Sequence, residues 1–151
     1  MADSIRELIT QAVLSRMQTV TVVNGYETDV GLMLERARRS FEEDELPAGA
    51  VWPGPEESAA GYQNTGQEMQ IDIDLHGLVK NETADRTANR LIADARRGME
   101  TYDAALTALI DGLQYAGADP QYPEDGGEIV SVKVTYKITY QTVRGDPYAS
   151  P

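Results

Sequence analysis

The chain has 151 residues, 41% of them hydrophobic and 25% charged, which suits one globular domain rather than a disordered segment. Its formal net charge is −12, from 25 acidic against 13 basic residues, and such a surface repels the phosphates of nucleic acids. There is no cysteine, which excludes disulfides, thiolate metal sites and cysteine nucleophiles.

The N-terminal segment predicts an amphipathic helix. Ser4 and Glu7 have the spacing of a capping box, and apolar residues recur at helical spacing from Ile5 to Val20. The same start lacks the basic and apolar regions of a signal peptide, and no apolar run approaches the roughly 20 residues that cross a bilayer. We therefore expect a cytoplasmic protein, or one assembled in a cytoplasm.

The next segments are less regular. After a turn at Asn24-Gly25, apolar and polar residues alternate over 26–35 and favour a strand, although a helix from Asp29 would also gather Leu32 and Met33. The prolines that follow allow a short edge strand at Ala48–Trp52 and then an exposed loop over 56–65.

The stretch "MQIDIDLHG" is the clearest strand pattern. Met69, Ile71, Ile73 and Leu75 alternate with polar residues, which include Asp72, Asp74 and His76. From Thr83 the period changes and predicts a helix to Tyr102. Residues 104–116 fit either a continuation of that helix or a strand.

The C-terminal part contains a turn-rich loop, "ADPQYPEDGG", and a long strand over 128–142. We expect one domain over 1–144 and a flexible tail over 145–151. Because strands and helices do not alternate regularly, the fold class is α+β, with an antiparallel or mixed sheet flanked by two main helices.

Asp72, Asp74 and His76, the only histidine, resemble a row of metal ligands. However, same-face side chains on a strand stand roughly 6.5–7 Å apart, so the outer two cannot reach one ion. Lys133 and Lys137 occupy the polar face of the C-terminal strand, and cross-strand Asp–Lys pairs are the simpler interpretation. We therefore predict no metal and no cofactor.

Motifs of common enzymes are also missing, including Walker, G-x-G-x-x-G, G-x-S-x-G and H-E-x-x-H sequences. We expect the protein not to be an enzyme. Tyrosine is frequent, with eight Tyr against one Phe. Exposed aromatic residues favour protein interfaces. The predicted subunit or partner interface comprises Tyr26, Asp29, Trp52, Tyr62, Tyr122 and Tyr148.

The order of these features resembles the tail terminator (tail completion) proteins of tailed bacteriophages. The resemblance runs through "NGYETDVG", "ELPAGAVW", "EMQIDIDL", "ANRLIADARRGM" and "VSVKVTYKITYQTVRGDP", and so spans nearly the whole chain. It implies a sheet flanked by helices, with a strand after Tyr102, and no catalytic residues.

The resemblance also implies a role in the virion, assembled in the host bacterial cytoplasm. Six copies would close into a ring that caps the head-proximal end of the tail tube, with the tube protein and the head–tail connector as partners. DNA would pass through the channel without specific binding, and Asp72, Asp74 and His76 would face that channel or pair across strands. The alternatives are another neck or tail component, such as a connector or tube-initiation protein, a small enzyme that uses the acidic strand, and a binding module with a dimeric sheet interface.

Overall fold

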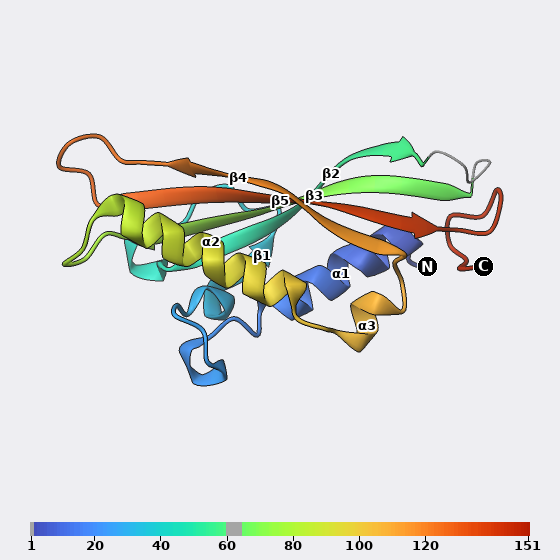
Figure 1. Cartoon of the computed structure of the whole chain (residues 1–151), viewed down its shortest axis with the longest axis horizontal. Helices are drawn as coiled ribbons and strands as arrows, with labels where there is room; N and C mark the ends of the chain where they lie inside the picture. Colours follow the sequence, from blue (N-terminus) through green and yellow to red (C-terminus); the bar gives the residue numbers. More distant parts are fainter. Residues whose placement is uncertain (1, 60–64) are drawn as a thin grey trace.

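A computed structural model describes residues 2–59 and 65–151, which are organised around one five-stranded sheet (Figure 1). The strands are β1 (Leu34–Arg36), β2 (Ala48–Ser58), β3 (Gly66–Leu78), β4 (Gly112–Gln121) and β5 (Ile129–Gln141). The helices are α1 (Ile5–Met17), α2 (Ala84–Glu100) and the short α3 (Ala104–Thr107). Short 3₁₀ turns lie at Val22–Asn24, Val30–Met33 and Glu43–Glu45.

The sheet is mixed and is covered by helices on one side. Its strand order is β1-β2-β3-β5-β4, with β1 parallel to β2 and every other pair antiparallel. All three helices lie on the same face of the sheet (Figure 1). This confirms the predicted α+β class. None of the helices in the described residues is long and apolar enough to span a membrane.

The core forms where the two central strands meet the helices. From Met69 onward in β3, and throughout β5, buried residues alternate with partly or fully exposed ones, as the sequence pattern predicts. The strands pair in register from Gly66 with Gln141 to Leu78 with Ile129. The fully buried side chains of this face include Met69, Ile71, Ile73, Leu75, Val134, Tyr136 and Ile138.

Helix α1 begins where the sequence predicts. The Ser4 hydroxyl accepts a hydrogen bond from the Glu7 amide at 3.1 Å, which satisfies one free N–H of the first turn. Glu7 does not complete the capping box, because its carboxylate instead forms an ion pair with Arg36 of β1. This pair joins α1 to the edge of the sheet.

The second helix ends sooner than predicted. α2 stops at Glu100, and Tyr102 lies outside it with 76% of its surface exposed. The ambiguous stretch 104–116 contains both structures, since α3 forms one turn and β4 begins at Gly112. The strand after Tyr102 that the family resemblance implies is therefore present, after a short helix.

The predicted strand over 26–35 is wrong for most of its length. Only the last residues form β1, and the preceding segment is a loop with a 3₁₀ turn. The carboxylate of Asp94 on α2 holds this loop, because it accepts hydrogen bonds from the Glu27 amide at 3.2 Å and the Thr28 amide at 2.8 Å. Gly31 lies against the backbone that follows α1 and donates its amide to Val20 O at 2.8 Å.

Strand β2 is longer than predicted. It continues to Ser58, so the segment 56–58 is strand rather than exposed loop. β1 pairs only with Gly49–Val51, which leaves the later part of β2 at an open edge of the sheet. Pro53 and Pro55 lie in this part, beside an irregularity in the pairing, where a missing amide costs no ladder hydrogen bond.

Both ends of the chain meet near one end of the sheet (Figure 1). The Ile5 amide donates to Pro147 O at 3.0 Å, and Val143 forms an isolated bridge with Asp146. The C-terminal segment thus contacts the start of α1. The flexibility of 145–151 stays a prediction.

The position of Gly31 gives a stability prediction. A Cβ added there would lie 2.6 Å from Gln18 O and 2.7 Å from Val20 O, so Gly31→Ala forces the loop away from α1. We expect a loss of about 1–3 kcal/mol in the free energy of unfolding, measured by chemical denaturation. Gly112→Ala is the matched control, because a Cβ there meets nothing within 4 Å. Equal effects of the two substitutions would contradict the close approach.

Candidate functional site

The face of the sheet opposite the helices carries the polar residues that the sequence singled out. Gln70, Asp72, Asp74 and His76 of β3 lie on it, all half-buried. Their partners in register on β5 are Lys137, Thr135, Lys133 and Ser131. We call these eight residues the polar face.

Asp72 is the better satisfied of the two aspartates. Its Oδ1 accepts a hydrogen bond from the Thr135 hydroxyl at 2.8 Å. It lies directly opposite Thr135 rather than opposite a lysine. The predicted adjacency of the acidic and lysine-bearing strands is therefore correct, but the register does not bring Asp72 to a lysine.

Asp74 has the opposite character. Its Oδ1 is buried and has no hydrogen-bond partner within the described residues, although Lys133 is its register partner. Burial raises the pKa of the Asp74 carboxyl, and the nearby Lys133 opposes that shift. The ion pair on this face instead joins Lys137 to Glu68 at 3.8 Å. Asp74 is thus a charged group that is poorly compensated within one subunit.

His76 is anchored from two sides. Its Nδ1 lies 2.7 Å from Ser131 Oγ, and its ring centroid lies 5.6 Å from that of Phe41. Burial lowers the pKa of its imidazole, and Asp74 acts in the opposite direction. In residues 2–59 and 65–151, no three histidine, aspartate or glutamate side chains converge as metal ligands. Within the subunit, the His76 ring is held by Ser131 and packs against Phe41.

The connection from β1 to β2 adds a second layer at this edge of the polar face. Arg39 stacks on the Trp52 ring at 4.2 Å, and Arg38 stacks on Phe41 at 4.4 Å. Arg38 also pairs with Glu45 at 2.6 Å, which ties the two ends of the connection together. Trp52 is half-buried under Arg39, and its indole Nε1 has no partner among the described residues.

The residues predicted to form an interface differ in their exposure to solvent. Tyr26 is only 8% exposed and belongs to the core, so its ring does not offer the surface expected of it. Asp29 is half-buried and its Oδ1 accepts from the Val22 amide at 2.8 Å, which gives it a local structural role. Tyr122 and Tyr148 are exposed by 54% and 57%. Tyr62 lies outside the described residues.

Sequence reasoning missed a second set of exposed apolar residues. Val22, Val23 and Leu32 are exposed by 53%, 94% and 72% on the loops that join α1 to β1. These loops are well anchored, since Asp94 holds Thr28 and Asp29 holds Val22. The sequence signal for this surface is the run of β-branched residues over 19–23, just before the turn at Asn24-Gly25. A fixed apolar projection is typical of an interaction surface.

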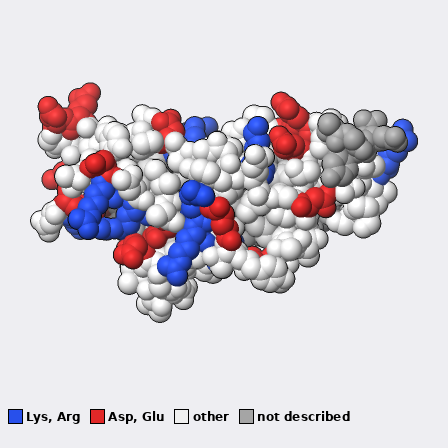
Figure 2. All heavy atoms as spheres, in the orientation of Figure 1, with Lys and Arg blue, Asp and Glu red and all other residues white. Residues whose placement is uncertain are grey.

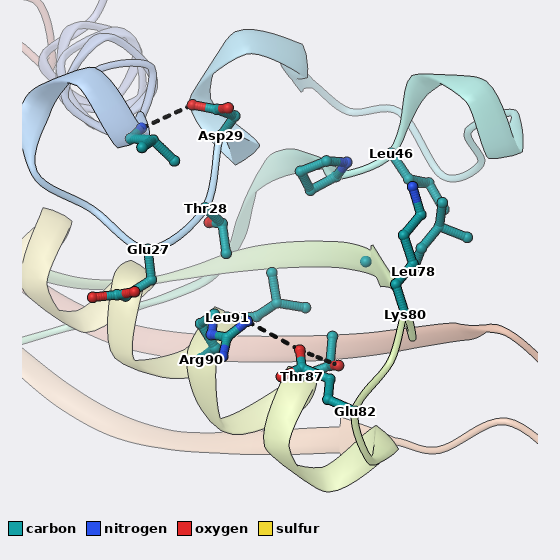
Figure 3. A pocket seen from close by; sticks show the side chains of 13 residues that line it. Glu27, Thr28, Asp29, Leu46, Leu78, Lys80, Glu82, Thr87, Arg90 and Leu91 are labelled. Atoms are coloured by element: carbon teal, nitrogen blue, oxygen red, sulfur yellow. Dashed lines mark hydrogen bonds and ion pairs between the residues drawn. The ribbon is translucent and has the colours of Figure 1, made fainter.

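A pocket of about 260 Å³ lies beside these loops, between residues 27–29, Leu46–Pro47 and the first half of α2 (Figure 3). Arg90 lines the pocket and forms an ion pair with Glu82 at 3.1 Å. Glu82 also accepts from the Thr87 hydroxyl at 2.9 Å. Glu82 and Arg90 therefore compensate each other inside the pocket.

The environment of Asp74 gives a pH-dependent prediction. Its pKa is raised in the folded chain, so the ionised carboxylate costs stability near neutral pH, and this cost fades as the pH falls through the raised pKa toward the unfolded value. We expect Asp74→Asn to stabilise the protein at pH 7.5 by on the order of 0.5 kcal/mol, with a smaller gain in acid.

Thermal unfolding at several pH values measures this effect. Asp72→Asn is the control, because Asp72 accepts the Thr135 hydrogen bond and its replacement should bring no gain. A destabilised Asp74→Asn variant at pH 7.5 would show that Lys133 compensates the carboxylate fully.

Comparison with known proteins gives a limited result. No protein-family model matches the chain, and no curated protein matches it. A chain in the solved virion of a native gene transfer agent (GTA) particle superposes with a TM-score of 0.47 at 16% identity. The superposition covers 87% of this chain and 93% of that one.

Proposed function

We propose that the protein is a structural component of a tailed-phage-like particle and acts as a tail terminator. In this role, copies of the chain form a ring on the last ring of the tail tube, stop its growth and offer a surface to the head connector. The protein works through assembly rather than catalysis. The sequence resemblance described above supports this role.

The observation that carries the proposal is the one-sided architecture. The three α-helices cover one face of the sheet (Figure 1). The other face is polar and carries no α-helix of the described residues, although the β1–β2 connection packs on it beside His76. A wall of such subunits presents two chemically different surfaces. A ring around a DNA channel needs this difference, because one surface meets the channel and the other supports the wall.

Ring closure sets a further requirement. Subunits in a cyclic ring meet through heterologous contacts, so each copy must present two different surfaces to its neighbours. The chain offers distinct exposed features, including the loop residues Val22, Val23 and Leu32 and, elsewhere, Tyr122 and Tyr148. A terminator must also bind the last ring of the tail tube on one side, and its other side must not bind a further ring of tube protein.

The polar face is assigned to the channel in this proposal. Asp72 and Asp74 would then add negative charge to the lumen and keep passing DNA from binding. Asp74 supports this assignment, because its carboxylate lies on the polar face and is poorly compensated within the subunit. A structure of the assembled particle with both aspartates outside the channel would end this assignment.

Deletion of the gene in the particle that encodes it tests the function. We expect overlong tails that are detached from heads, because nothing stops tube polymerisation or completes the joint. Electron microscopy of negatively stained lysates measures tail length, and expression of the wild-type chain in trans is the control. Tails of normal length joined to heads would refute the proposal.

The assembled mass gives an independent check. Native mass spectrometry should detect a six-subunit ring, or a monomer that forms a ring only on tube tips. A tight dimer that persists on dilution would count against a terminator and favour a binding module with a dimeric interface.

A further inference from the structure

A second pocket, separate from the polar face, lies where the C-terminal ends of α1 and α2 converge. It has a volume of about 260 Å³ and is lined by Arg16, Thr19, Asn24, Tyr26, Arg97 and Thr101. The lining contains two arginines and no carboxylate. In a chain with 25 acidic and 13 basic residues, this composition is unusual.

The two arginines are held in place by neutral groups. Arg16 donates from Nε to Gly98 O at 2.8 Å and from Nη2 to the Tyr26 hydroxyl at 3.2 Å. Arg97 donates from Nη1 to Gly25 O at 2.7 Å, and its guanidinium lies 4.9 Å from the centre of the Tyr26 ring. Arg16 Nη1 and Arg97 Nη2 have no hydrogen-bond partner among the described residues. The two guanidinium groups are therefore held in fixed positions, and each keeps N–H groups that can donate to a further partner.

Helix-end electrostatics explain only part of this arrangement. A cation in the last turn of each helix offsets the partial negative charge of the helix C-terminus. That stabilisation of each helix end does not require the two arginines to line the same pocket. Elsewhere in the described residues, Arg6, Arg36, Arg38, Arg86, Arg90 and Arg96 form ion pairs with carboxylates. Arg16, Arg39, Arg97 and Arg144 form none with a described residue, and of these four Arg16 and Arg97 share one pocket. Paired guanidinium groups with free donors suit a carboxylate from outside the subunit.

The same chain carries a matching acidic segment. Residues 98–132 contain no lysine or arginine. At the turn between β4 and β5, Glu124, Asp125 and Glu128 are exposed and form no ion pair with any described residue. Acidic side chains lie at the upper tip of this end of the molecule, and a group of basic side chains lies below them (Figure 2). The turn projects at one end of the sheet, far from the converging helix ends, so it cannot reach its own pocket (Figure 1).

We propose that the Arg16–Arg97 pocket receives the acidic β4–β5 turn of a second copy of this chain. This inference rests on the proposed ring and names one of its subunit contacts. The contact is heterologous, because pocket and turn are different parts of the surface, and such contacts close a ring. Exposed apolar residues adjoin the pocket, since Val23 precedes Asn24 and Tyr102 follows Thr101. They supply the apolar contact that such interfaces use.

Charge reversal on each side tests the contact. The pocket variant is Arg97→Glu, and the turn variant is Glu124→Arg with Asp125→Arg. Each variant alone sets like charges against each other in every contact between its copies, so self-association should weaken by at least about tenfold. Sedimentation velocity of the purified full chain over a range of concentrations and salt measures this, and circular dichroism with thermal unfolding checks that each variant is folded.

A mixture of the two variants separates the contact from a folding defect. In an equimolar mixture, the reversed turn of one variant faces the reversed pocket of the other, while the remaining contacts are wild-type. We expect the mixture to recover wild-type association. Asp44→Arg is the control for a charge change alone, since Asp44 is exposed, lies outside both surfaces and forms no ion pair with described residues.

Several results of these measurements would contradict the proposed contact. Unchanged association of both variants, failure of the mixture to recover, or a wild-type chain that stays monomeric at every concentration would each overturn it. Inorganic phosphate that stabilises the wild type but not Arg97→Glu, with association unchanged, would assign the pocket to a free anion and would also overturn it. The tail-length experiment is independent, so the proposed function can stand when this contact fails.

Discussion

The burial of one face of β3 and β5 beneath α1 and α2 is the constraint on which the rest of the structure depends. The two strands pair without interruption over thirteen positions, and their alternate side chains form the centre of the core. A slip of one residue would move every buried side chain to the solvent face. The same register therefore fixes both the core and the polar face, including the position of Asp74 opposite Lys133.

The sequence predicts well what short-range periodicity determines. It locates α1 with its Ser4 cap, β3, most of α2 and β5, and it places Asp72, Asp74 and His76 together on one face. It fails where a distant residue decides the local structure. The segment 26–33 alternates like a strand, yet Asp94 captures its amides from a position 66 residues away from Thr28. No local pattern reveals such a contact.

The loop that replaces the predicted strand also lines the Arg16–Arg97 pocket, through Tyr26. Asp94 and Arg97 of α2 hold the two sides of the loop around Gly25–Thr28, and Tyr26 places its ring between that loop and the arginines. The tyrosine predicted to lie at an interface is thus buried, but it supports a surface that we assign to one. The sequence pattern does not reveal that Tyr26 is buried, because the arginines that contact it lie on two different helices.

The prolines at the two edges of the sheet have a consequence for how copies can meet. Pro53 and Pro55 lie in the open part of β2, and Pro120 lies in β4, which also has an irregular pairing after Tyr115. Edges of this kind resist backbone pairing with another strand. Copies of the chain are therefore steered away from endless sheet extension toward contacts made by side chains. Contacts between charged side chains weaken as the salt concentration of the surroundings rises, so their strength depends on the medium in a way that backbone pairing does not.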